Sequence, residues 1–137
     1  MKLPRDVQEL LIRKAESIHN KAYAPYSRFK VGAAVLSDSD TIYTGCNVEN
    51  GSYGLSVCAE RNAVAAAVAG GDHKIKAVAI YTPTSEVTVP CGACRQVLSE
   101  FNPDMDVLLI NKDRQVQSMR LSDLMPKPFL FEGSPHE

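Results

Sequence analysis

The chain has 137 residues, about the size of one domain, of which 45% are hydrophobic and 23% are charged. This balance is typical of a globular protein and excludes wholesale disorder. The formal net charge is −1 and no long basic run is present, which argues against binding a nucleic-acid polymer mainly through phosphate contacts and favours a small ligand.

Residues 1–23 mix charged residues into their apolar positions and lack the continuous apolar segment of a signal peptide. No stretch of the sequence approaches the length of a membrane span. We therefore expect a cytoplasmic protein with no membrane partner, in which cysteines serve as metal ligands, catalytic groups or core residues more often than as disulfides. Because no repeat, linker or low-complexity tract divides the chain, residues 1–137 are expected to form a single domain.

The first part of the chain predicts a helix followed by a β-hairpin. Residues 5–21 predict an amphipathic helix, whose apolar face is formed by Val7, Leu10, Leu11, Lys14, Ala15 and Ile18. The segment 22–29 ends this helix as a loop. Residues 30–37 and 41–48 are two apolar, partly β-branched runs around a polar turn, a pattern that indicates a hairpin.

The central part of the chain predicts a helix, a strand and another helix. Residues 56–69 are rich in alanine and end at Gly70 and Gly71, which predicts a helix with a C-terminal stop signal. Residues 76–82 form a short apolar run that is typical of a buried strand. Residues 89–101 predict the next helix.

The last part of the chain predicts two more strands, 106–112 and the weaker 114–120, and a short helical turn at 121–125. The complete order is therefore α-β-β-α-β-α-β-β. This order predicts an α/β fold in which a mixed five-stranded sheet carries helices on both faces, a three-layer α/β/α sandwich.

Cys91 and Cys94 lie three positions apart at the start of the helix 89–101, directly after Pro90. Both sulfurs then project from one side of the helix, with Cβ atoms about 5–6 Å apart. The free N–H groups and the positive dipole end of this first turn favour thiolates, which are the form that a metal binds. On these residues alone, half a zinc site, a redox pair or disulfide, and two buried cysteines all stay open.

A zinc ion needs more than two ligands, and the sequence has neither a second CxxC motif nor a histidine pair. Of the other cysteines, Cys46 is expected to be a small core residue, whereas Cys58 lies near the start of the other cysteine-bearing helix. Two helix starts that face each other across the carboxyl edge of the sheet would bring Cys58, Cys91 and Cys94 onto one ion. Three protein ligands leave the fourth position open, as in a catalytic zinc site.

Two charged residues follow Cys58 in the same predicted helix. Arg61 is placed to donate a hydrogen bond to a ligand sulfur and offset the negative charge of three thiolates, although its spacing also fits a surface arginine. Glu60 is placed to act as a proton shuttle that is not itself a ligand. Because a glutamate in a helix is commonly solvated, this hypothesis rests on its position in the Cys-Ala-Glu triplet.

CAER at 58–61 and PCGACRQ at 90–96 resemble the three-cysteine form of the zinc-deaminase signature. The resemblance extends to APYSRFKVGAAV at 24–35 and GCNVENGSYGLSVCAER at 45–61, which are similar to the small, tetrameric cytidine deaminases that act on free nucleosides. It covers most of the chain, from about residue 15 to residue 131. The resemblance implies the cytidine deaminase fold and hydrolytic deamination of cytidine and 2′-deoxycytidine in pyrimidine salvage.

The resemblance also implies the roles of the residues around the metal, Cys58, Glu60, Arg61, Cys91 and Cys94, which we call the metal corner. One Zn²⁺ per subunit would be held by Cys58, Cys91 and Cys94, and water activated by this ion would attack C4 of cytosine. Glu60 would protonate N3 and later the leaving amine, which gives uridine and ammonia. Arg61 matches the arginine that hydrogen-bonds the ligand sulfurs in three-cysteine members.

Further residues are implied in substrate binding. Asn47 and Glu49 would bond the ribose 3′-hydroxyl, Phe29 would line the base pocket, and the backbone of Ala59 would hydrogen-bond the pyrimidine. Tyr53 and Phe131 would reach a neighbouring subunit's site, as in a homotetramer with shared active sites. The predicted substrate-binding residues are Phe29, Asn47, Val48, Glu49, Asn50, Gly51, Ser52, Tyr53, Ala59 and Phe131.

Two features depart from the family pattern: Gly51 stands where alanine is common, and the tail 133–137 matches nothing. Rival functions are a deaminase of the same fold that acts on another aminopyrimidine such as blasticidin S or on a base within RNA or DNA, and a non-enzymatic structural zinc module. The low net charge disfavours the polymer, and the segment 47–50 favours a free nucleoside over a peptidyl antibiotic. A thiol oxidoreductase is a third rival, but it has no use for Cys58.

Overall fold

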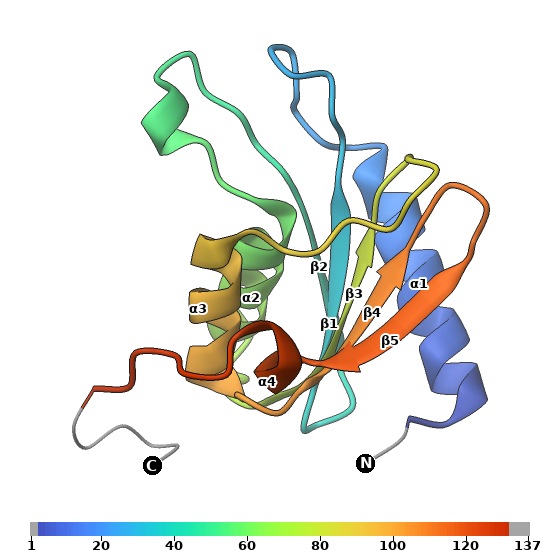
Figure 1. Ribbon diagram of the computed structural model, residues 1–137, viewed down its shortest axis with the longest axis vertical. Helices are drawn as coiled ribbons and strands as arrows, with labels where there is room; N and C mark the ends of the chain where they lie inside the picture. Colours follow the sequence, from blue (N-terminus) through green and yellow to red (C-terminus); the bar gives the residue numbers. More distant parts are fainter. Residues whose placement is uncertain (1–2, 132–137) are drawn as a thin grey trace.

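The computed structural model describes residues 3–131, which form three layers around one five-stranded sheet (Figure 1). The tail 133–137 lies outside the described residues. The strands run across the sheet in the order β2-β1-β3-β4-β5. Their bounds are β1 Gly32–Ser37, β2 Ile42–Cys46, β3 Ile75–Tyr81, β4 Asp106–Ile110 and β5 Val116–Arg120.

The sheet is mixed, as the sequence predicts. β1 pairs antiparallel with both β2 and β3, β3 pairs parallel with β4, and β5 returns antiparallel to β4. The parallel pair needs a crossover connection, which α3 (Gly92–Phe101) provides. In this register Gly32 lies opposite both Cys46 and Tyr81, and Tyr81 lies opposite Ile110. The carboxyl ends of β2, β3 and β4 therefore meet at one edge of the sheet.

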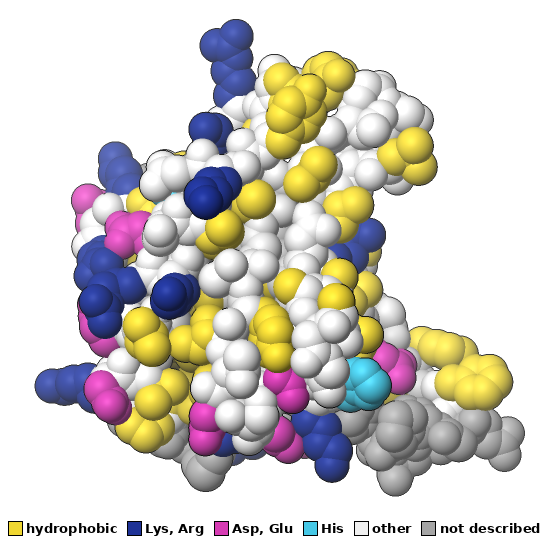
Figure 2. All heavy atoms as spheres, turned by 180° about the vertical axis from the view of Figure 1, so that it is seen from behind, with side chains coloured by type: hydrophobic (Ala, Val, Ile, Leu, Met, Phe, Trp, Pro, Cys, Tyr) yellow, Lys and Arg dark blue, Asp and Glu magenta, His cyan; other side chains and the backbone are white. Residues whose placement is uncertain are grey.

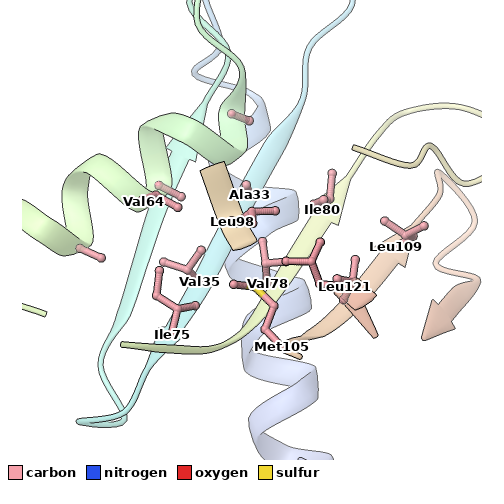
Figure 3. Close-up of a cluster of buried hydrophobic side chains, with 14 residues drawn as sticks. Ala33, Val35, Val64, Ile75, Val78, Ile80, Leu98, Met105, Leu109 and Leu121 are labelled. Carbon is pink, nitrogen blue, oxygen red and sulfur yellow. The ribbon is translucent and has the colours of Figure 1, made fainter. Parts of the chain in front are cut away.

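Helices cover both faces of the sheet, which confirms the predicted sandwich (Figure 1). α1 (Arg5–His19) packs on one face, and α2 (Ala59–Ala69), α3 and the short α4 (Leu121–Leu124) pack on the other. Side chains alternate between the two faces along the central strands. Figure 3 shows Val35, Val78 and Leu98 in the core on the α2 and α3 side, whereas Ala34 and Ala79 belong to the core under α1.

The buried face of α1 differs from the predicted one. The buried residues of the helix are Leu11, Ile12 and Ala15, whereas Leu10 and Lys14 of the predicted face are exposed. The helix touches β1 at Gly32, where a Cβ atom would lie 2.0 Å from the carbonyl oxygen of Ala15. This close approach centres the contact on Ala15 and turns Leu10 toward solvent.

A second close approach sets the position of α2. A Cβ atom at Gly45 in β2 would lie 2.3 Å from the amide nitrogen of Ala63 and 2.6 Å from the carbonyl oxygen of Ala59. The first turns of α2 therefore lie directly on the backbone of β2. Among the described residues, no helix is both long enough and apolar enough to cross a bilayer.

Candidate active site

Two helix starts meet near the carboxyl edge of the sheet, and each carries a cysteine at its N-cap. Cys58 precedes α2 and Cys91 precedes α3. The helix α2 begins three residues later than predicted, because Val57 is held in two backbone hydrogen bonds with Val48. Cys94 follows in the first turn of α3 and is fully buried.

The three cysteine sulfurs lie close enough to share one metal ion. Cys91 Sγ lies 3.8 Å from Cys58 Sγ and 3.4 Å from Cys94 Sγ, and all three sulfurs lie within 4.8 Å of one another. Tetrahedral zinc with Zn–S bonds of about 2.3 Å would space its sulfurs about 3.8 Å apart. Within residues 3–131 no histidine or carboxylate joins this group, so a tetrahedral ion would keep one position for a molecule from solution. The half-buried Cys46 also stays outside it.

The protonation of the sulfurs also fits a metal site. A hydrogen bond from Cys94, together with the Arg61 guanidinium, lowers the pKa of Cys58 to about 5, so this sulfur is a thiolate near neutral pH. The same hydrogen bond raises the pKa of Cys94, whose proton is held by the Cys58 sulfur. One ligand is thus already in the form that a metal binds.

Arg61 lies against this sulfur group and is not a free surface arginine. Its Nη2 atom lies 3.8 Å from Cys58 Sγ and donates to the Ser56 carbonyl oxygen at 3.4 Å. Its Nε atom is buried without a hydrogen-bond acceptor among the described residues. A spare buried donor beside the sulfurs suits a site that gains negative charge when all three thiols ionise.

Glu60 is buried, and only 5% of its surface is exposed. It lies in the first turn of α2, beside the sulfur group. Burial raises the pKa of its carboxyl group, and the negative charge of Cys58 adds to the effect. A carboxyl group with a raised pKa beside a metal site can exchange protons near neutral pH, as a general acid and base must. The alternative of a solvated helix glutamate is therefore wrong.

A cavity of about 200 Å³ opens beside these groups. Its walls include Phe29, Asn47 and Ala59, which the sequence predicts, together with Cys58, Glu60 and Cys91. Five further residues line the cavity and were not predicted from the sequence. A signal for them exists, because ligands of open α/β sheets bind beyond the carboxyl ends of strands, and these residues lie near the end of β3, before Cys91 or next to Gly32. They are Val31, Ile80, Thr82, Thr88 and Val89.

Asn47 holds one wall of this cavity in place. Its Oδ1 atom accepts a hydrogen bond from the Val31 amide, and its Nδ2 atom donates one to the Phe29 carbonyl oxygen, both at 2.8 Å. The side chain thereby fixes the turn that carries Phe29. One hydrogen of Nδ2 stays available for a ligand.

A second hollow of about 340 Å³ is lined by Tyr26, Ser27, Glu49, Tyr53 and Ser56. The Glu49 carboxylate accepts hydrogen bonds from the amides of Tyr26 at 3.0 Å and Ser27 at 3.1 Å, and from the Ser27 hydroxyl. These bonds, above all the one from the Ser27 hydroxyl, lower the pKa of Glu49. Glu49 is therefore ionised near neutral pH.

The other predicted substrate-binding residues lie outside both hollows. Val48, Asn50, Gly51 and Ser52 belong to an exposed loop, in which Asn50 Oδ1 accepts a hydrogen bond from the Ser52 amide at 2.9 Å. Phe131 is 71% exposed and does not reach the described cavity of its own chain. Seen from behind, hydrophobic side chains gather on the lobe that carries the loop after β2 and near the C-terminal segment, and the surface is hollowed between these two places (Figure 2).

Comparison with known proteins assigns the chain to a family. The model for the cytidine and deoxycytidylate deaminase zinc-binding region matches residues 5–110. The cytidine deaminase of Sporosarcina psychrophila is 43% identical over 90% of this chain and 92% of its own length, and that of Mycobacterium tuberculosis H37Rv is 47% identical over 85% and 84%. The crystal structure of cytidine deaminase from Burkholderia pseudomallei matches with a TM-score of 0.85 and 44% identity, and the match covers 88% of this chain and 98% of that one. The chain therefore belongs to the cytidine and deoxycytidylate deaminase family and carries its zinc-binding region.

Proposed function

We propose that residues 1–137 form one deaminase domain that hydrolyses cytidine and 2′-deoxycytidine to uridine and 2′-deoxyuridine, with release of ammonia, as a step of pyrimidine salvage. The observation that carries this proposal is the buried Glu60 carboxyl group, which lines the same cavity as two of three sulfurs spaced for one zinc ion. The Sporosarcina and Mycobacterium relatives are named cytidine deaminases, which supports the choice of substrate.

In the proposed mechanism, Cys58, Cys91 and Cys94 would hold a zinc ion, which would lower the pKa of a water molecule and so supply the nucleophile that forms a bond to C4 of the cytosine ring. Glu60 takes up the proton that this water releases and delivers it to N3 of the cytosine ring. The same carboxylate then takes the proton of the hydroxyl group now on C4 and delivers it to the amino group on C4 as the C–N bond breaks, which leaves the C4 carbonyl group of uridine. One water is consumed for each ammonia released.

Arg61 has a supporting role in this mechanism. Its hydrogen bond to Cys58 Sγ withdraws negative charge from a ligand sulfur. Three thiolates alone would weaken the ability of a zinc ion to acidify water, so this withdrawal preserves reactivity. The raised pKa of Glu60 supports its proposed role in proton transfer, because the carboxyl group must both accept and release a proton.

The substrate contacts form the next part of the proposal. Phe29 and the backbone of Ala59 would contact the pyrimidine ring, since both line the cavity. Asn47 and Glu49 would bind the ribose 3′-hydroxyl, through the spare Nδ2 hydrogen and the ionised carboxylate. Val48, Asn50, Gly51 and Ser52 would form the loop around the sugar.

We also propose a homotetramer with shared active sites, located in the cytoplasm. Tyr53 and Phe131, which are 75% and 71% exposed, would each complete the site of a neighbouring subunit. Tyr53 also lines the second hollow, and large exposed hydrophobic patches are typical of an interaction surface. All four cysteines are free, which suits a reducing compartment.

Ultraviolet absorbance tests the substrate proposal directly. Purified zinc-loaded protein is incubated with cytidine, 2′-deoxycytidine and blasticidin S in parallel. We expect the spectra of both nucleosides to change to those of the uridine products, with no change for blasticidin S. Turnover of blasticidin S alone would favour the rival deaminase, and a zinc-loaded protein without any turnover would favour a structural zinc module.

A further inference from the structure

Three threonine hydroxyl groups form a row beside the cavity, and the mechanism above does not use them. Thr82 follows β3 and is 1% exposed, and Thr82 and Thr88 both line the cavity. Thr82 Oγ1 lies 2.8 Å from Thr84 Oγ1 and 3.3 Å from Thr88 Oγ1. Thr84 in turn donates to the Glu86 carbonyl oxygen at 2.5 Å. The row therefore runs from a backbone carbonyl to the cavity wall.

Of the three hydroxyl groups in the row, only that of Thr88 is free to donate a hydrogen bond. Each threonine has one hydroxyl hydrogen, and that of Thr84 is used on Glu86, because a carbonyl oxygen only accepts. The contact between Thr82 and Thr84 must then use the hydrogen of Thr82. Thr88 is only a second, more distant acceptor for that same hydrogen. Among residues 3–131, the hydroxyl hydrogen of Thr88 has no acceptor.

The rest of the cavity wall has few other groups that can recognise a ligand. Phe29, Val31, Ile80 and Val89 are apolar. Asn47 uses Oδ1 and one Nδ2 hydrogen to hold the turn around Phe29, and its other Nδ2 hydrogen is proposed above to bind the ribose. The cysteines and Glu60 form the metal corner. The Thr88 hydroxyl is thus a donor on the cavity wall that pairs neither with the metal corner nor with another described residue. It is available to an acceptor on a ligand.

We propose that Thr88 Oγ1 donates a hydrogen bond to an acceptor on the pyrimidine ring of the bound nucleoside, and that Thr82 is a positioning residue for Thr88. The C2 carbonyl oxygen, which cytidine and uridine share, is such an acceptor. Thr82 is suited to its role because its backbone amide continues the β3–β4 ladder, donating to the Ile110 carbonyl oxygen at 3.1 Å. This inference rests on the proposed function and adds a specificity-determining residue to it.

Matched substitutions separate the hydroxyl from the methyl group of Thr88. Thr88→Val removes the donor at nearly constant volume and should raise KM for cytidine about three- to tenfold, with little change in kcat. Thr88→Ser keeps the hydroxyl and should stay within about twofold of the native KM. Thr82→Val should raise KM less than Thr88→Val does, and Thr82→Ser should restore it. Thr41→Val, in the exposed β1–β2 turn, is the control.

Equilibrium dialysis with labelled uridine gives a readout that does not depend on turnover. Thr88→Val should weaken uridine binding by the same factor as KM, whereas Thr88→Ser should not. Equal affinities of the native and Thr88→Val proteins would overturn the inference, whether or not cytidine is turned over. A native protein that binds uridine with the expected threonine dependence but does not deaminate cytidine would overturn only the proposed reaction. Absence of uridine binding by the native protein would overturn both.

Discussion

The metal corner and the loop-and-tail region of this protein differ in how far one chain completes them. In the metal corner, formed by the starts of α2 and α3, the chain itself buries Cys94 fully and leaves Glu60 only 5% exposed, and only Cys91 of the three cysteines is exposed. The loop-and-tail region, comprising residues 47–55 and 126–131, leaves large apolar side chains in solvent, among them Leu55 at 67% exposure and Phe131 at 71%. One chain thus suffices to bring the metal-binding and proton-transfer groups together. Under the proposed homotetramer, side chains of neighbouring subunits would enclose the substrate.

The two regions are also held together by different forces. Gly45 lets β2 touch the backbone of α2, so close packing fixes the residues that follow Cys58. The loop is fixed by hydrogen bonds, such as those between Glu49 and the turn at Tyr26 and Ser27. The tail is held by Gln96, whose side-chain amide donates to the Phe129 carbonyl oxygen and accepts from the Phe129 amide. Backbone packing thus fixes the metal corner, whereas exposed side-chain hydrogen bonds fix the loop and the tail.

The largest effect is expected from removing a metal ligand. Cys94→Ala leaves two sulfurs and should abolish stoichiometric zinc binding, with a loss of activity on the order of 10³-fold or more, since even indirect partners of a ligand change activity by 10–100-fold. Zinc content is measured by atomic absorption together with turnover. Cys46→Ala, at the free cysteine outside the group, is the control and should keep its zinc. A Cys94→Ala protein with native zinc content would contradict the ligand assignment.

Mixing two defective variants tests whether neighbouring subunits share active sites. Glu60→Ala lacks the proton shuttle, and Phe131→Ala lacks the aromatic side chain that we propose to serve a neighbour. If sites are shared, tetramers reassembled from both variants contain some sites with an intact Glu60 and a native Phe131. Activity of the reassembled mixture should then exceed the sum of the two separate variants, and mere additivity would argue against shared sites.

The packing of the metal corner is broken by Gly45→Ala. The new Cβ atom would lie 2.3 Å from the Ala63 amide nitrogen, so α2 must shift. Such overpacking should lower the free energy of unfolding by about 1–3 kcal/mol, as measured by urea denaturation. Gly54→Ala is the matched control in the loop, because a Cβ atom there meets nothing within 4 Å. Equal stability of the two variants would show that the close approach of β2 and α2 is not required.

The smallest effect is a pH dependence of the loop. The Ser27 hydroxyl lowers the pKa of Glu49 in the folded state, so the stabilisation is present above the unfolded pKa and is lost as the pH falls through the lower, folded value. Glu49→Gln should therefore reduce the drop in stability between about pH 6 and about pH 3, relative to the native protein. Glu86→Gln, outside both hollows, is the control, and an identical drop in the native and Glu49→Gln proteins would contradict the prediction.

The sequence predicts the three layers and the meeting of the three cysteines, because both follow from the periodicity of the elements and from the topology of a mixed sheet. It cannot reveal that Glu60 is buried, since the face that a helix position presents depends on what packs over it. The prediction that Leu10 lies on the buried face of α1 was wrong for the same reason. The close contact between Gly32 and Ala15 sets which face of the helix is buried. The places of Thr82 after β3 and of Thr88 before Cys91 indicate that both lie near the cavity, but only the folded loop shows that their hydroxyl groups are neighbours on one wall.

The measurement that tests the account most directly is the zinc content and cytidine turnover of Glu60→Gln. Glutamine keeps the volume of the side chain but cannot carry a proton between water and substrate. We expect one zinc ion per chain, as in the native protein, and a loss of kcat on the order of 10²–10⁴-fold. Turnover near the native rate in a fully zinc-loaded Glu60→Gln protein would contradict the proposed role of this carboxyl group.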